Sequence, residues 1–139
     1  MSQPSEKFIL GAQMSQQFLG EKLFEEIRQH SRDDLPSNVG STYIAEVCFS
    51  SYARPELTFR DRSLMNIGIL IALNRPPELR IHIRAALHNG ISREQITEAC
   101  RHAMIYCGVP AGRDALGIAS DIFNQMDKAE KMTESAKLS

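Results

Sequence analysis

An apolar run at residues 60–73 constrains the fold of this chain most strongly. Leucine, isoleucine and methionine stand there on nearly every side of a helix, with none of the alternation that a strand requires. Thr58 is placed to cap the helix, and Asp61 can return the hydrogen bond. A helix that is apolar nearly all round lies at the centre of a bundle or at a subunit interface. The run therefore predicts an all-α protein.

Helical periodicity also fills most of the remaining chain. The first apolar stripe ends near Gln29 with a break predicted at Gly20, and residues 32–38 have the composition of a loop. Capping residues, prolines and glycines mark the ends of the later helices. These are expected at residues 43–52, 75–90, 92–107 and 111–126. The prediction is a bundle of about six helices.

Length and composition indicate one globular domain over residues 1–139, with flexible ends at residues 1–7 and 127–139. A net charge of −1 gives no reason to expect nucleic acid or an acidic membrane as a partner. No apolar run approaches the ~20 residues of a membrane span, and no secretory signal is visible, so the cytoplasm is the expected location. The three cysteines form no Cys-x-x-Cys pair, which favours reduced thiols over a disulfide framework or a zinc site.

The short helix at residues 75–90 is where we expect the chemistry. Prolines in its first turn and Gly90 after its last turn set its ends. Arg75, Glu78 and His82 follow one another at i, i+3 and i+7, which places them along one face. An imidazole titrates near neutral pH, so His82 is the candidate for proton transfer. Glu78 either orients that imidazole or is an acidic residue of the kind favoured at a helix N-terminus.

Arginine is concentrated in the middle of the chain, with nine arginines and no lysine between residues 54 and 113. A guanidinium group binds a carboxylate through two parallel hydrogen bonds, which suits a small anionic substrate. Arg54, Arg62 and Arg75 lie at or near expected helix ends and are the candidates for binding it. The alternative explanation, arginines on solvated helix faces, accounts for most of the nine. Tyr106 either supplies a hydroxyl hydrogen bond or is a half-buried tyrosine at a helix end.

Four short motifs follow one another between residues 78 and 110. They read Glu-Leu-Arg-Ile-His at 78–82, Asn-Gly at 89–90, Ser-Arg-Glu-Gln-Ile at 92–96 and Tyr-Cys-Gly-Val-Pro at 106–110. In this order the motifs resemble the γ-carboxymuconolactone decarboxylase family. The resemblance implies the helical fold of alkylhydroperoxidase D-like proteins and a homo-oligomer, either a trimer or a hexamer.

The peroxidase branch of that superfamily has a Cys-x-x-Cys ahead of its histidine, and this chain lacks it. When that histidine is aligned with His82, the two cysteines fall at Arg75 and Glu78. Neither side chain can replace a thiolate nucleophile, so peroxide chemistry at this site is not expected.

The resemblance implies decarboxylation with neither metal nor organic cofactor. In carboxymuconolactone the electrons of the departing carboxylate can pass through a C=C bond to the lactone carbonyl, so the substrate is its own electron sink. The protein then has to position the substrate, stabilise the developing oxyanion and deliver a proton. His82 is the expected proton donor, assisted by Glu78 and Tyr106, while Arg54, Arg62 and Arg75 are expected to bind the carboxylates.

The expected reaction converts 4-carboxymuconolactone to 3-oxoadipate enol-lactone, a step of protocatechuate catabolism. Two alternatives stay open. One is an enzyme of the same fold that acts on another carboxylated lactone or oxo acid, because a fold constrains the substrate weakly. The other is a homo-oligomer that binds a small molecule without catalysis.

Overall fold

The computed structural model describes residues 2–139, and within them it contains seven α-helices and no strand. The all-α prediction is therefore confirmed. The chain divides into two compact units, one ending at Arg62 and the other beginning at Ser63. Whether these units form the single domain expected from the chain length stays a prediction. Within residues 2–139, none of the helices has the length and hydropathy of a transmembrane span.

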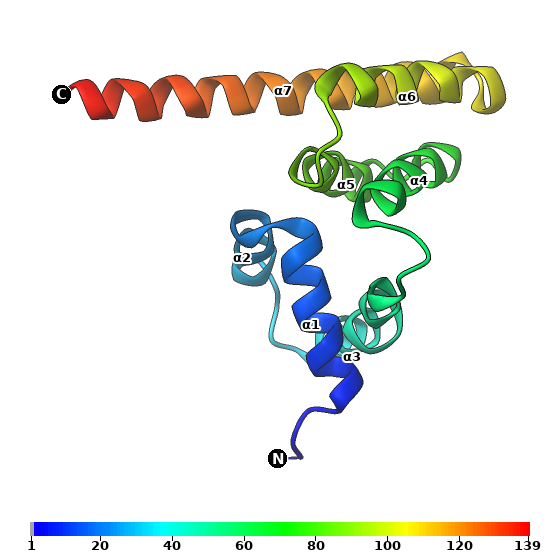
Figure 1. Ribbon diagram of the computed structural model, residues 1–139, viewed down its shortest axis with the longest axis vertical. Helices are drawn as coiled ribbons and strands as arrows, with labels where there is room; N and C mark the ends of the chain where they lie inside the picture. The colour runs from blue at the N-terminus through cyan, green and yellow to red at the C-terminus, as the bar shows by residue number, and fades with distance from the viewer. Residues whose placement is uncertain (1) are drawn as a thin grey trace. The chain divides into compact units, whose positions relative to one another are not determined.

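The first unit begins with α1 (Glu6–Leu19) and α2 (Glu21–Gln29), which meet at Gly20 (Figure 1). Gly20 has a φ of 82°, a conformation that favours glycine, so the predicted break is confirmed. The Ser5 hydroxyl accepts a hydrogen bond from the Phe8 backbone N–H and caps α1. Helix α1 thus begins within residues 1–7, which we expected to be flexible. Met1 lies outside the described residues.

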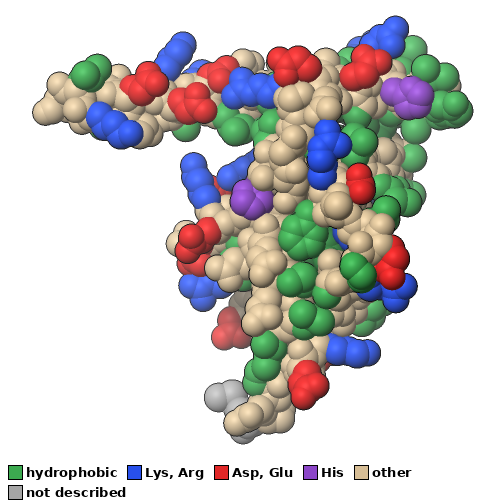
Figure 2. Space-filling model, in the orientation of Figure 1, with side chains coloured by type: hydrophobic (Ala, Val, Ile, Leu, Met, Phe, Trp, Pro, Cys, Tyr) green, Lys and Arg blue, Asp and Glu red, His purple; other side chains and the backbone are tan. Residues whose placement is uncertain are grey.

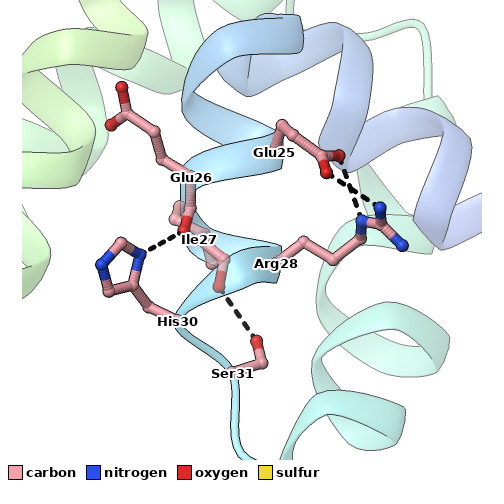
Figure 3. Close-up of polar contacts among 6 residues, drawn as sticks. All are labelled: Glu25, Glu26, Ile27, Arg28, His30 and Ser31. Atoms are coloured by element: carbon pink, nitrogen blue, oxygen red, sulfur yellow. Dashed lines mark hydrogen bonds and ion pairs between the residues drawn. The ribbon is translucent and has the colours of Figure 1, made fainter.

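Polar contacts hold the C-terminal end of α2 (Figure 3). Both oxygens of the Glu25 carboxylate accept from the Arg28 guanidinium, at 2.8 and 3.0 Å. The His30 Nδ1 lies 2.7 Å from the Glu26 carbonyl oxygen, and the Ser31 hydroxyl donates to the Ile27 carbonyl at 3.0 Å. Because helix ends leave backbone carbonyls unpaired, these contacts give His30 a structural explanation.

A third helix, α3 (Leu35–Tyr43), occupies much of the segment that we predicted to be a loop at residues 32–38. The Asp34 carboxylate accepts from the backbone N–H of Ser37, and Pro36 lies in the first turn. The loop prediction was wrong because residues that are common in loops are also those that start helices.

Two irregular turns replace the single helix predicted at residues 43–52. They are the π-helical η1 (Ile44–Cys48) and the 3₁₀-helical η2 (Phe49–Ala53). Helix α1 passes so close to η1 that a Cβ at Gly11 would overlap the backbone carbonyl of Ala45. Arg54, which precedes a proline, has extended backbone angles and ends the segment as predicted.

A cluster of aromatic rings surrounds Phe18 in the first unit. Phe18 is fully buried, and its ring centroid lies 4.8 Å from that of Tyr52 and 5.6 Å from that of Phe59. Phe49 joins the cluster at 6.1 Å. Ring pairs at these separations add to the stability gained from burying their area.

Helix α4 (Phe59–Ala72) begins in the first unit and continues into the second. The Thr58 hydroxyl accepts from the Asp61 N–H and the Asp61 carboxylate accepts from the Thr58 N–H, which confirms the predicted cap. The second unit then contains α5 (Pro76–His88), α6 (Arg93–Cys107) and α7 (Val109–Leu138). Its largest fully buried apolar side chains are those of Ile67, Ile83, Ile96 and Cys100.

Helices α6 and α7 lie side by side (Figure 1). The Ser92–Gln95 capping box predicted at the start of α6 is present. Gly108, with a φ of 93°, separates the two helices. Gly112 then faces α6 so closely that a Cβ there would overlap the Met104 side chain.

The last helix ends later than the predicted residue 126, because α7 continues to Leu138. Lys, Glu, Ala and Met predominate in this extension, and all four favour helices even without a core to pack against. Acidic and basic side chains alternate along this helix on the face drawn in Figure 2.

We predict that Gly112→Ala destabilises the protein by about 1–3 kcal/mol relative to Gly117→Ala, because the added methyl overpacks the contact between α6 and α7. Gly117 is the matched control, since it lies on α7 with nothing within 4 Å of a Cβ. Gly117→Ala should stabilise by up to about 1 kcal/mol through helix propensity. Urea unfolding followed by circular dichroism measures both, and equal stabilities would contradict the packing of α6 on α7.

Candidate functional site

Helix α5 positions His82 at the edge of the second unit's core. Arg75 occupies the N-cap, Pro76 and Pro77 form the first turn, and Gly90 follows the end with a φ of 89°, so the predicted ends are confirmed. Leu79 and Ile83 on the inward face are 3% and 0% exposed. His82 lies one helical turn after the buried Leu79 and is half-buried.

The environment of His82 favours its neutral form. Burial lowers the pKa of the imidazole below its ordinary value of 6.5, because a charged ring loses hydration there. The Glu78 carboxylate, one turn earlier, opposes this effect and raises the pKa by charge, but burial is the larger cause. Glu78 itself is exposed, so its influence on His82 is that of a nearby charge.

Two polar contacts join α4 to α5 within the second unit. The Asn66 side-chain amide nitrogen Nδ2 lies 3.4 Å from Nδ1 of His82. The Asn89 amide, at the end of α5, donates to the fully buried Ser63 hydroxyl at 3.0 Å. Sequence reasoning assigned no function to Asn66. The signal that points to it is a large polar side chain in an apolar run, where polar groups are costly to bury unless hydrogen-bonded.

The three candidate arginines are divided between the two units. Arg75 is exposed at the entrance of α5, on the same helix as Glu78 and His82. Arg62 is in the first unit, where Nη2 donates to the Arg54 carbonyl at 3.0 Å. The hydrogen bond places Arg62 beside Arg54, whereas Arg75 shares only its helix with Glu78 and His82.

The guanidinium of Arg62 has a structural role in the first unit. Its Nε donates to the Leu57 carbonyl at 3.3 Å, and it lies 5.4 Å from the ring centroid of Tyr52. Arg54 pairs with the exposed Glu56 carboxylate at 3.9 Å. Exposed pairs of this length contribute little to stability, so the Arg54 side chain is not strongly held. A substrate-binding role for either arginine stays a prediction.

Tyr106 lies in the last turn of α6 and is 81% exposed, so the alternative explanation of a half-buried tyrosine is wrong. Its ring centroid lies 5.5 Å from that of His102. Ile105 and Val109, at 69% and 58% exposed, are its neighbours along the chain. Hydrophobic side chains gather at this end of the second unit in Figure 2. A hydrogen-bonding role for Tyr106 stays a prediction.

The three cysteines are free thiols, as expected. Burial raises the pKa of the Cys100 thiol to about 11, which makes it an unreactive core residue. Among the described residues no three or more histidine, cysteine or carboxylate side chains are grouped as a metal site would require.

Comparisons with known proteins add to this geometry. The sequence model of the Carboxymuconolactone decarboxylase family matches residues 41–121. The 4-carboxymuconolactone decarboxylase of Acinetobacter baylyi is 37% identical over 75 residues, which cover 54% of this chain and 56% of that protein. The nitrosuccinic acid decarboxylase npaB of Metarhizium robertsii is 38% identical over 80 residues, which cover 57% and 56%. Each match thus spans little more than half of the relative. All six candidate site residues lie inside residues 41–121.

We predict that nuclear magnetic resonance (NMR) titration will give His82 a pKa below 6.5, and that Glu78→Gln will lower that pKa further by removing the opposing charge. Glu94→Gln, which removes an exposed carboxylate from the first turn of α6, is the control and should leave the His82 pKa unchanged. An ordinary pKa for His82, or one insensitive to Glu78→Gln, would contradict the account of this site.

The lowered pKa of His82 also makes the free energy of unfolding depend on pH. Because the unfolded chain binds a proton at position 82 more readily than the folded chain, this histidine opposes folding as pH falls through about 6.5 and does not oppose it at higher pH. His82→Gln should therefore lose less free energy of unfolding than the wild type between pH 7.5 and pH 5. Urea unfolding at the two pH values measures the difference, and an equal loss would contradict the lowered pKa.

Proposed function

Because this chain belongs to the carboxymuconolactone decarboxylase family, we propose that it is a decarboxylase that acts on a small dicarboxylate without a metal or an organic cofactor. The match over residues 41–121 carries this proposal, because it includes the half-buried His82 and the helix that presents it. The resemblance inferred from the motifs is thereby confirmed, while the reaction itself is the proposal.

The substrates named for the two relatives share their chemistry. Carboxymuconolactone and nitrosuccinic acid each carry two carboxylates and an electron-withdrawing group that can accept the electrons released with CO2. In the first this group is the conjugated lactone carbonyl, and in the second it is the nitro group. We therefore propose a substrate with one departing carboxylate, one retained carboxylate and a built-in electron sink.

His82 is proposed to deliver the proton that completes the reaction. Burial destabilises a charged imidazole, whereas a bound dianion supplies opposite charge and favours protonation. The C–C bond to the departing carboxylate breaks, its electrons pass to the sink, and the N–H proton of His82 moves to the carbon that gains the new C–H bond. The ring becomes neutral, which is the form that burial favours, so burial makes the charged ring a stronger acid.

The other candidates have supporting roles in this proposal. Glu78 raises the pKa of His82 by charge and so assists its protonation. Arg75, exposed at the entrance of the same helix, is proposed to bind a substrate carboxylate. Binding roles for Arg54 and Arg62, and a hydroxyl contact from Tyr106, remain part of the proposal without a contact that supports them.

The natural substrate is either 4-carboxymuconolactone, as in protocatechuate catabolism, or another acid with the same electronic arrangement. The name of the second relative favours keeping nitrosuccinate as a second candidate. The non-enzymatic alternative is a homo-oligomer that binds such acids without converting them. The CO2-release assay distinguishes this alternative from a decarboxylase of either acid.

Self-association into a homo-oligomer, a trimer or a hexamer, is also part of the proposal. Helix α4 buries Ile67 and Ile71, but this helix and the residue after it leave an apolar set exposed, namely Leu64 at 42%, Met65 at 59%, Ile69 at 43% and Leu73 at 62%. Residues 63–74 include no charged side chain, and Gly68 leaves room for a neighbour because nothing lies within 4 Å of a Cβ there. A second copy of the same apolar face is a partner that this surface suits.

We predict that the purified protein releases CO2 from 4-carboxymuconolactone or from nitrosuccinate in the presence of a chelator. His82→Ala should lower kcat by about 100-fold or more, the usual contribution of a general acid. His30→Gln alters a histidine that contacts the end of α2 and should leave kcat unchanged.

Absence of CO2 release from both acids would reject both as substrates, and tight binding of either acid without turnover would favour the non-enzymatic alternative. Full activity of His82→Ala would reject His82 as the proton donor while leaving the reaction in place.

We predict that the wild type has the solution mass of a trimer or a hexamer of the 15.6 kDa chain. Met65→Lys should shift this mass toward that of the monomer, because a charge buried in an apolar interface is costly. Ser135→Lys, on the exposed end of α7, is the control and should not change the mass. Light scattering after size-exclusion chromatography measures all three, and a wild-type monomer would contradict the assembly.

A further inference from the structure

Asn66 is an unusual residue for its position. It is half-buried on α4, in the segment of residues 63–74 that holds no charged side chain. Burying an amide in such surroundings is unfavourable unless its polar atoms are hydrogen-bonded. The other polar residue on this stretch of the buried face, Ser63, accepts from Asn89, whereas the amide nitrogen of Asn66 faces His82.

The chemistry of this contact selects one form of the ring. An amide nitrogen only donates, so the contact between Nδ2 of Asn66 and Nδ1 of His82 requires Nδ1 to accept and to carry no proton. A neutral imidazole with a bare Nδ1 carries its proton on Nε2. At 3.4 Å the hydrogen bond is long, so it favours this orientation and tautomer of the ring by a small free energy.

We propose that Asn66 is a positioning residue that holds His82 as the neutral Nε2–H tautomer and so makes Nε2 the nitrogen that serves the substrate. This inference rests on the proposed role of His82 in decarboxylation. Glu78, on the same helix, acts on the ring by charge, and residues 63–74 of the facing segment contribute no charge. The neutral Asn66 amide contacts Nδ1, which distinguishes this nitrogen from Nε2.

An amide can follow the ring through a change of charge. When substrate binding favours protonation, Nδ1 gains a proton, and the Asn66 amide can turn to accept it with its carbonyl oxygen. The Nε2 proton then passes to the substrate carbon, which leaves a neutral ring with Nδ1–H. A carboxylate at position 66 can only accept, and an alkyl group can do neither. Asparagine therefore suits both states.

Nitrogen NMR of the wild type without substrate tests the tautomer directly. At pH 8 the spectrum should show a bare Nδ1 and a protonated Nε2 in His82. Asn66→Asp should move the proton to Nδ1 and raise the pKa of His82, because a carboxylate accepts from Nδ1–H and favours a charged ring. Asn124→Asp, on an exposed position of α7, is the control and should change neither the tautomer nor the pKa.

Kinetics with the active substrate then measures the functional effect. Asn66→Leu, which keeps the size but removes the polar atoms, should lower kcat by about tenfold with little change in KM, because it misorients the proton donor without removing a substrate contact. Asn66→Asp should shift the pH profile of kcat toward higher pH, which a merely structural role would not do. If Asn66→Leu does not fold, the pH profile of Asn66→Asp still distinguishes a positioning role from a structural one.

The two proposals fail in different ways. An Nδ1–H tautomer in the wild type, or a tautomer unaffected by Asn66→Asp, would overturn the role of Asn66 even if the protein releases CO2. If no acid is decarboxylated but the NMR result is as expected, the proposed function fails while Asn66 still sets the tautomer of His82.

Discussion

Burial of one face of α5 is the interaction on which the rest of the second unit depends. Leu79, Ile83 and Ala86 are at most 3% exposed and belong to one core with residues of α4, α6 and α7. Burying a side chain such as that of Ile83 contributes about 1.5–3 kcal/mol. Because this stripe fixes the rotation of α5, His82 lies at the edge of the core and Glu78 lies outside it. The chemistry of the site thus follows from the packing of the helix.

Partial burial gives His82 properties that an exposed histidine lacks. Burial lowers the pKa of the ring and so favours its neutral form. In the proposed reaction a bound dianion offsets this cost, and because CO2 leaves as a neutral molecule, both negative charges stay on the substrate until the proton is transferred. The Asn66 amide adds a directional constraint, since it contacts one nitrogen of the ring and thereby distinguishes it from the other. In this account the substrate supplies the electron sink, while the protein supplies the proton and fixes the direction from which it reaches the substrate carbon.

Local signals in the sequence were sufficient for most of the helices and for the helix that holds the candidate site. The caps at Thr58 and Ser92 and the break at Gly20 depend on nearby residues, and the structure has each of them as expected. The segment at residues 35–53 was predicted as a loop followed by one helix. The structure instead has α3 and two irregular turns, and the close passage of α1 beside the π-helical turn is not visible in the local sequence. The contact between Asn66 and His82 spans sixteen positions, and helical periodicity gives no register between two different helices.

The fate of the transferred proton tests the central claim most directly. The reaction is run in D2O with whichever acid is decarboxylated, and the product is analysed by NMR for deuterium at the carbon that gains hydrogen. If His82 delivers the proton from a fixed direction, the wild type will place one deuterium on a single face of that carbon. His82→Ala will release less CO2 and give a mixture of both faces. Stereochemically mixed deuteration by the wild type, or an unchanged single face in His82→Ala, would contradict the account.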